Sequence, residues 1–373
     1  MPHALIVLLS RDLSLDGSVL THIPGICCVR RTRSSIGKYS AIALVKGLCL
    51  AVFLALSTLG LASGAQTSHP APKRKPKPPQ KELKRADIDG SMVGYIDDSS
   101  VHSQVRLRFD AGFNDPRPDR AEYFYAGECC PPASNQAVQR TLNFQQLYMS
   151  GEYAPLKRFS VFTLIPYRWI QPIYIPAPNT VQPISSGGGI SDVQAGLKFG
   201  LIANDSRQLT FQFRSYFPSG DGVAGFGTNH YSVEPMLLYY QHLSDRVAVE
   251  SEFGDTHPIG GTTYYPGTTP PTSQNFAGDV LMYGVGPSYK LIDRDNYQVT
   301  PVLELVAWHV FGGLQTGNDN VVQSAAGINV FNIKIGARLN FGNGNSIYAG
   351  YGHGVTSDIW YSNLFRIEYR HAF

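Results

Sequence analysis

The residues best placed to do chemistry in this sequence are charged side chains spaced two apart within apolar segments. Arg106, Arg108 and Asp110 alternate with apolar residues. A second such row lies near the C-terminus, at Arg366, Glu368 and Arg370. Side chains two apart on an extended chain point to the same side. Each row therefore lines one face of a strand, where it can pair ions, hold water or guide a solute.

β-Strands must position these rows, and the same alternation of apolar and polar residues recurs along the chain. Because one face of each segment is apolar and the other polar, every strand should separate two different environments. We expect about twelve strands, near residues 104–114, 141–153, 159–169, 191–203, 207–217, 231–242, 246–254, 279–291, 297–308, 329–341, 346–355 and 361–373.

The connections between these segments alternate between short and long. The short ones are residues 154–158, 204–206, 243–245, 292–296 and 342–345. Short turns at one end, long loops at the other and an even strand number are typical of outer-membrane barrels. We therefore predict an all-β protein, a transmembrane antiparallel up-and-down β-barrel with both termini in the periplasm. Residues 91–98 and 121–125 could add two strands, giving fourteen, and a soluble two-sheet sandwich is the competing architecture.

Composition is compatible with this fold and excludes other classes. Of the 373 residues 16% are charged and 12% aromatic, which is unlike a disordered chain or a coiled coil. The net charge of +3 is too small to suggest a nucleic-acid partner.

The N-terminal region predicts export. Residues 47–62 form an apolar run preceded by basic residues and followed by small ones before Gln66, as in a signal peptide that is removed. A membrane anchor is the alternative, although the run is short for a spanning helix. We expect residues 1–65 to be an N-terminal extension and signal peptide, residues 66–90 a Pro/Lys-rich periplasmic linker, and residues 91–373 a barrel in the bacterial outer membrane.

Strand parity also predicts which side chains line the lumen. Both signs of charge are present, so the interior should contain interlocked ion pairs, and a solute pathway lined by the same groups is the functional interpretation. The predicted lumen residues are Arg106, Arg108, Asp110, Asp192, Lys198, Arg214, Tyr216, Glu234, Glu250, Glu252, Glu304, Lys334, Arg338, Arg366, Glu368 and Arg370.

Other reactive residues are few. Cys129 and Cys130 are adjacent in the chain and could form a redox pair. The sequence around them contains no His or third Cys, so we do not expect a zinc site. His309 and His353 share parity with the predicted lipid-facing residues, and no Ser-Asn-Gly or Gly-x-Ser-x-Gly pattern accompanies them. We therefore expect no enzyme activity, no metal and no cofactor.

The last residues alternate up to a terminal Phe373. This ending resembles the assembly signal of bacterial outer-membrane proteins, which implies the outer-membrane assembly machinery and outer-membrane lipid as partners. His371 stands where an aromatic residue is often found.

Three neighbouring segments carry a family resemblance. Residues 187–201 read GGGISDVQAGLKFGL, residues 208–220 read QLTFQFRSYFPSG, and residues 231–241 read YSVEPMLLYYQ. Together they resemble the bacterial outer-membrane transporter family assigned to the meta-cleavage pathway of phenol degradation, with Ser191 in place of a usual glycine. The resemblance covers about half of the barrel and implies a channel for small molecules, including hydrophobic or aromatic ones. A non-conducting structural or adhesin-type barrel acting through its extracellular loops is the alternative.

Overall fold

The computed structural model describes residues 91–115, 139–174, 186–222, 224–260, 277–316, 322–342 and 344–373. The predicted signal peptide and linker, residues 121–125 and the Cys129–Cys130 pair lie outside the described residues. Within the described ranges no helix is long and apolar enough to cross a membrane.

Twelve long strands make the wall of the structure, and each begins and ends within a few residues of a predicted segment. They are β1 (Gln104–Asp115), β2 (Gln139–Leu156), β3 (Phe159–Tyr174), β5 (Val193–Asn204), β6 (Arg207–Phe217), β7 (Tyr231–His242), β8 (Val247–Ile259), β9 (Val280–Tyr289), β11 (Tyr297–Val310), β14 (Asn329–Phe341), β15 (Asn345–Gly354) and β16 (Asn363–Ala372). Four short strands accompany them: β4 (Gly187–Ile190), β10 (Ile292–Asp293), β12 (Leu314–Thr316) and β13 (Val322–Ser324).

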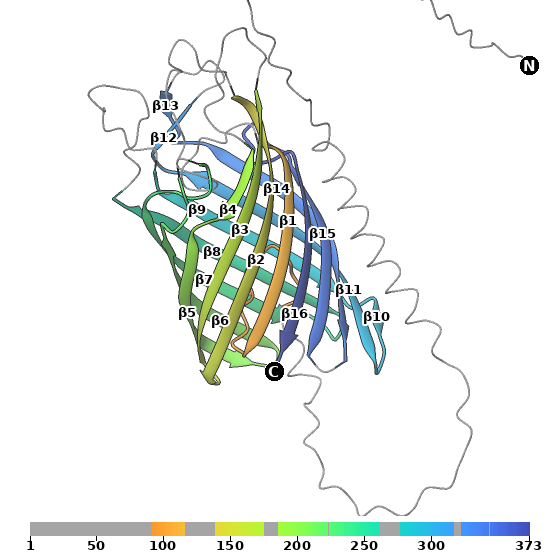
Figure 1. Cartoon of the computed structure of the whole chain (residues 1–373). Helices are drawn as coiled ribbons and strands as arrows, with labels where there is room; N and C mark the ends of the chain where they lie inside the picture. Colours follow the sequence, from red (N-terminus) through yellow and green to blue (C-terminus); the bar gives the residue numbers. More distant parts are fainter. Residues whose placement is uncertain are drawn as a thin grey trace, which may run out of the picture. The chain divides into compact units, whose positions relative to one another are not determined.

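Each wall strand pairs antiparallel with its neighbours in the chain, and the wall closes where β1 pairs with β16 (Figure 1). At this seam Arg106 lies opposite Arg370, and Asp110 lies opposite Arg366. Closure leaves no unpaired edge in the wall, so backbone N–H and C=O groups are satisfied between strands, as a membrane-spanning sheet requires. The predicted antiparallel barrel of twelve strands is confirmed.

The outer face of the wall is apolar. Leu107, Phe253 and Ile335 are each about half exposed although they are large hydrophobic residues. Their neighbours along the strands, such as Glu252 and Lys334, are buried and polar. A barrel that is apolar outside and polar inside is built to lie in lipid, so the low charge content of the sequence reflects a lipid-facing surface.

The segment just before β1 is inside the barrel. Residues 91–103, here named the plug, contain no strand, and Met92, Val93 and Ile96 are almost completely buried. The expectation that residues 91–98 could be an extra strand is therefore wrong. Their alternation of apolar and polar residues reflects contacts with the lumen wall, because their backbone N–H groups are bound by wall side chains.

A charge on the lipid-facing surface should destabilise the barrel according to its depth. Ile335 is the middle residue of β14, whereas Val105 is the second residue of β1, opposite His371 near the C-terminus, and both face outward. We expect Ile335→Lys to lower the free energy of unfolding by about 2–4 kcal/mol and Val105→Lys by about 0–1 kcal/mol. Urea unfolding of the protein in lipid vesicles measures both. Equal costs at the two positions would contradict this placement of the membrane.

Candidate functional site: the plugged lumen

Three wall carboxylates bind six consecutive backbone N–H groups of the plug. Glu250 accepts from Met92 at 2.8 Å and from Val93 at 3.3 Å. Glu304 accepts from the next three residues, Gly94 N at 3.0 Å, Tyr95 N at 2.8 Å and Ile96 N at 2.8 Å. Glu252 accepts from Asp97 N at 2.9 Å. Hydrogen bonds to a charged acceptor are about twice as strong as neutral ones, so these contacts fix the path of the plug backbone inside the barrel.

Arginines hold the carbonyl groups of the same residues. Arg338 donates to Met92 O at 3.1 Å and to Val93 O at 2.7 Å. Arg370 donates to Ser91 O and Val93 O at 3.2 Å, and Arg366 donates to Gly94 O. Because β16 carries two of these three arginines, the strand that closes the barrel also binds the plug.

The returning part of the plug is held by ion pairs and hydroxyl groups. Asp97 pairs with Arg214, and Asp98 lies 3.4 Å from Arg370. Thr210 donates its hydroxyl hydrogen to Ser99 O. Burial acts to raise the pKa of Asp97, but the positive charge of Arg214 and other nearby cations outweighs it and lowers that pKa well below its usual value. Asp97 is therefore a charged anchor inside the lumen.

The side chain of Tyr95 lies at the turn of the plug between two cations. Lys334 Nζ and the guanidinium carbon of Arg366 are each 4.2 Å from the centre of its ring. The ring of Tyr348 packs edge-on against it, with ring centres 6.1 Å apart. Cation–π contacts of this kind strengthen when water is excluded, so Tyr95 ties the tip of the plug to β14, β15 and β16.

The residues predicted to line the lumen are brought together in this interior. Those described as buried are Asp110, Asp192, Lys198, Glu234, Glu250, Glu252, Glu304, Lys334, Arg338, Arg366, Glu368 and Arg370, and those of intermediate burial are Arg106, Arg108, Arg214 and Tyr216. Arg366 grips Asp110 through two hydrogen bonds of 2.7 Å, and Arg338 pairs with Glu368 at 2.9 Å.

Asp192 lines the cavity and also binds a loop. It lies between β4 and β5, and its carboxylate accepts hydrogen bonds from Gly220 N at 3.0 Å, Thr228 N at 2.8 Å and Thr228 Oγ1 at 2.7 Å. It therefore fixes the loop between β6 and β7 at the end of the barrel with the long connections. The sequence also gave no sign of Glu152, which pairs with Lys198 at 3.0 Å inside the lumen.

A cavity of about 260 Å³ begins at the tip of the plug and extends toward the ends of the strands that carry the long loops. Tyr95 and Asp97 form part of its floor, and Thr228 and Thr256 lie near its outer end. Its charged lining consists of seven cationic and five acidic side chains: Arg106, Arg108, Arg168, Lys198, Arg214, Lys334 and Arg366, against Asp97, Asp110, Asp192, Glu234 and Glu252. Aromatic and apolar side chains, such as Phe144 and Trp308, line the rest.

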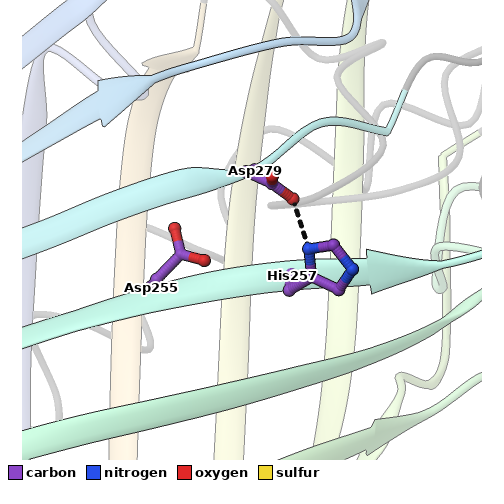
Figure 2. A group of neighbouring side chains, drawn as sticks. All are labelled: Asp255, His257 and Asp279. Carbon is purple, nitrogen blue, oxygen red and sulfur yellow. Dashed lines mark hydrogen bonds and ion pairs between the residues drawn. The ribbon is translucent and has the colours of Figure 1, made fainter.

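One group of possible metal ligands lies on the outer face near the same end. Figure 2 shows Asp255 and His257 on β8 beside Asp279, which directly precedes β9. One ligand atom from each lies within 4.8 Å of the others, and His257 Nδ1 is 2.7 Å from Asp279 Oδ1. The side chain of His257 is 57% exposed. The His–Asp hydrogen bond by itself accounts for this arrangement.

The two histidines considered as catalytic bases are also at this outer rim. His309 Nδ1 lies 2.8 Å from Asn329 Oδ1, and His353 Nδ1 lies 3.2 Å from Asn363 Oδ1. Their neighbours two residues away on the same face are Ala307, Phe311, Tyr351 and Val355. Of these, Tyr351 carries a hydroxyl, and it donates to the same Asn363 Oδ1 at 2.5 Å, so the His–Asn pairs are polar contacts between neighbouring strands.

No protein-family model and no curated protein matches the chain. Among solved structures, an outer-membrane channel from Pseudomonas putida F1 is 12% identical with a TM-score of 0.47, covering 73% of this chain and 96% of its own. The β-domain of the Bordetella autotransporter BrkA is 13% identical with a TM-score of 0.43, covering 74% and 100%. The KdgM porin in complex with disordered oligogalacturonate is 11% identical with a TM-score of 0.35, covering 72% and 99%. We draw no conclusion about function from similarities at this level.

Removing one wall acceptor should loosen the tip of the plug without opening the barrel. In Glu304→Gln, an amide replaces the carboxylate that accepts from Gly94, Tyr95 and Ile96. A lost hydrogen bond to a charged group is worth about 1.5–3 kcal/mol, so hydrogen exchange at these amides should accelerate about ten- to a hundredfold.

Mass spectrometry of deuterium uptake measures this exchange. Glu234→Gln is the matched control, because Glu234 contacts Arg214, Tyr216 and Thr256 and no backbone group of the plug. Unchanged protection of residues 94–96 in Glu304→Gln would show that these hydrogen bonds do not hold the plug.

Proposed function

We propose that this protein is an outer-membrane channel for small molecules whose lumen is closed in the resting state by the plug. The proposal rests on the observation that side-chain hydrogen bonds hold the plug in the lumen. Its backbone is bound by charged wall side chains such as Glu304 and Arg338, with no strand pairing. Water can replace these contacts one at a time, whereas the wall itself is held by continuous strand ladders.

The wall is suited to a water-filled path once the plug has left. Glu250, Glu252 and Glu304 stand on β8 and β11, and Arg338, Arg366 and Arg370 stand on β14 and β16. With the plug gone, these groups line a polar surface with both signs of charge, which favours hydrated solutes and avoids the high barrier of a single-sign ring. The cavity beyond the plug is smaller than most sites for drug-sized ligands, so the solutes are small.

The location and partners of the protein belong to the same proposal. The predicted signal peptide and periplasmic linker support export, and the terminal Phe373 supports recognition by the outer-membrane assembly machinery. The resemblance of residues 187–241 to the transporter family of phenol degradation supports small hydrophobic or aromatic molecules as solutes.

A non-conducting barrel that acts through its extracellular loops is the second candidate. Such a barrel needs a filled lumen, and the plug fills much of it. Releasing the plug distinguishes the two functions, because only a channel passes ions and solutes afterwards.

A disulfide between plug and wall makes this test reversible. A Cβ atom added at Gly286 on β9 would lie 2.8 Å from Val93 Cγ1 in the plug, which is close to the separation of a Cβ from the partner sulfur in a disulfide. In a Val93→Cys/Gly286→Cys protein with Cys129 and Cys130 changed to Ser, oxidation should lock the plug.

Conductance in planar bilayers is the measurement. We expect the oxidised protein to stay closed and the reduced protein to open under applied voltage. A chain lacking residues 91–99 should remain open, and the protein with only the two Ser changes is the control. Absence of conductance and of solute flux in the chain lacking residues 91–99, with the barrel folded, would leave the structural barrel as the function.

A further inference from the structure

Lys334 is a buried cation inside the lumen without an ion-pair partner. It lies on β14, is 4% exposed and lines the cavity above the plug. Among the described residues, the ion pairs within 4.0 Å do not include it. A buried charge is normally paired, so other neighbours must stabilise the ammonium group of Lys334.

The natural partner of Lys334 is engaged elsewhere. Glu304 on β11 is directly opposite Lys334 in the strand register, and both side chains point inward. Both oxygen atoms of Glu304 accept hydrogen bonds from the plug backbone, and Oε1 also accepts one from Tyr348 at 3.1 Å. The plug and Tyr348 therefore occupy the oxygen atoms of Glu304, and Lys334 makes no hydrogen bond to them.

Aromatic rings surround the ammonium group in place of a carboxylate. Lys334 Nζ lies 4.2 Å from the ring centre of Tyr95, 5.2 Å from that of Trp308 and 6.0 Å from that of Tyr361. Ring faces stabilise the positive charge. They leave the three N–H donors of the ammonium free for an acceptor, because none of these contacts is a hydrogen bond to an oxygen atom.

Two arginines of the cavity lining are held by contacts with neighbouring side chains. Arg106 donates to Ser150 Oγ at 3.3 Å, and Arg108 lies 3.7 Å over the ring of Tyr148 with its Nε 3.5 Å from Asp110.

The acidic groups of the cavity have closer partners. Asp110 accepts a hydrogen bond from Arg366, and Asp97 and Glu234 both form ion pairs with Arg214. Glu252 accepts from Asp97 N, and Asp192 binds the loop between β6 and β7. These carboxylates are thus all engaged in hydrogen bonds or ion pairs, whereas the N–H donors of Lys334 are not.

We propose that this cavity is a binding site for a small monocarboxylate, with the carboxylate of the ligand accepting hydrogen bonds from Lys334. The apolar body of the ligand packs against side chains such as Phe144, Met282 and Leu364, which line the same cavity. The proposal rests on the channel function in naming the class of solute, but binding itself needs no passage.

Isothermal titration calorimetry on the mature chain in detergent micelles tests the site with benzoate and its uncharged isostere benzamide. We expect benzoate to bind about ten- to a hundredfold more tightly than benzamide, the range of a hydrogen bond to a charged partner. Lys334→Met should remove this preference, and Lys334→Arg should keep most of it.

Lys198→Met is the matched control, because Lys198 is a buried lysine lining the same cavity that already pairs with Glu152 at 3.0 Å. Heat-modifiable migration in gels shows that each variant has folded as a barrel. Equal affinity for benzoate and benzamide would overturn the proposal, and so would unchanged benzoate binding in a folded Lys334→Met protein.

The two proposals fail in different ways. Selective benzoate binding together with no flux after release of the plug supports the anion site and rejects the channel. Flux through the released barrel without any preference for benzoate supports the channel and rejects the anion site.

Discussion

A polypeptide backbone inside a barrel must find partners for its N–H and C=O groups, and the interior of this protein is organised by that requirement. The six N–H groups of Met92–Asp97 are bound by three wall carboxylates, and the carbonyl groups of Met92, Val93 and Gly94 by arginines. An unbound buried N–H or C=O group costs about 1–3 kcal/mol. The positions of the lumen charges therefore follow the path of the plug.

This arrangement links three parts of the molecule that are far apart in sequence. Glu304 accepts hydrogen bonds from the plug backbone. Lys334, which lies opposite Glu304, instead makes cation–π contacts with the rings of Tyr95 and Trp308. Tyr95 in turn is part of the plug. A carboxylate that binds Lys334 would therefore lie beside a residue of the plug.

The wall could be predicted from sequence because its signal is local. Period-two alternation identifies each strand and its two faces, so the charged rows of the first and last strands could be assigned to the lumen, whereas their register comes from the structure. The plug could not be predicted in this way. Glu304 and Tyr95 are 209 residues apart, and the atoms bound are backbone atoms that carry no residue signature. The hydrogen bonds of Asp192 to the loop between β6 and β7 could not be predicted either, because two of their three donors are backbone groups.

The seam between β1 and β16 also imposes an order on assembly. The plug directly precedes β1, and two of the arginines that hold it, Arg366 and Arg370, belong to the last strand of the chain. These contacts cannot form until the C-terminal ten residues have joined the sheet. The lumen that receives the plug is therefore complete only once the wall has closed, and a barrel that closed with the plug outside would leave Glu304 and Arg338 to be hydrated by water.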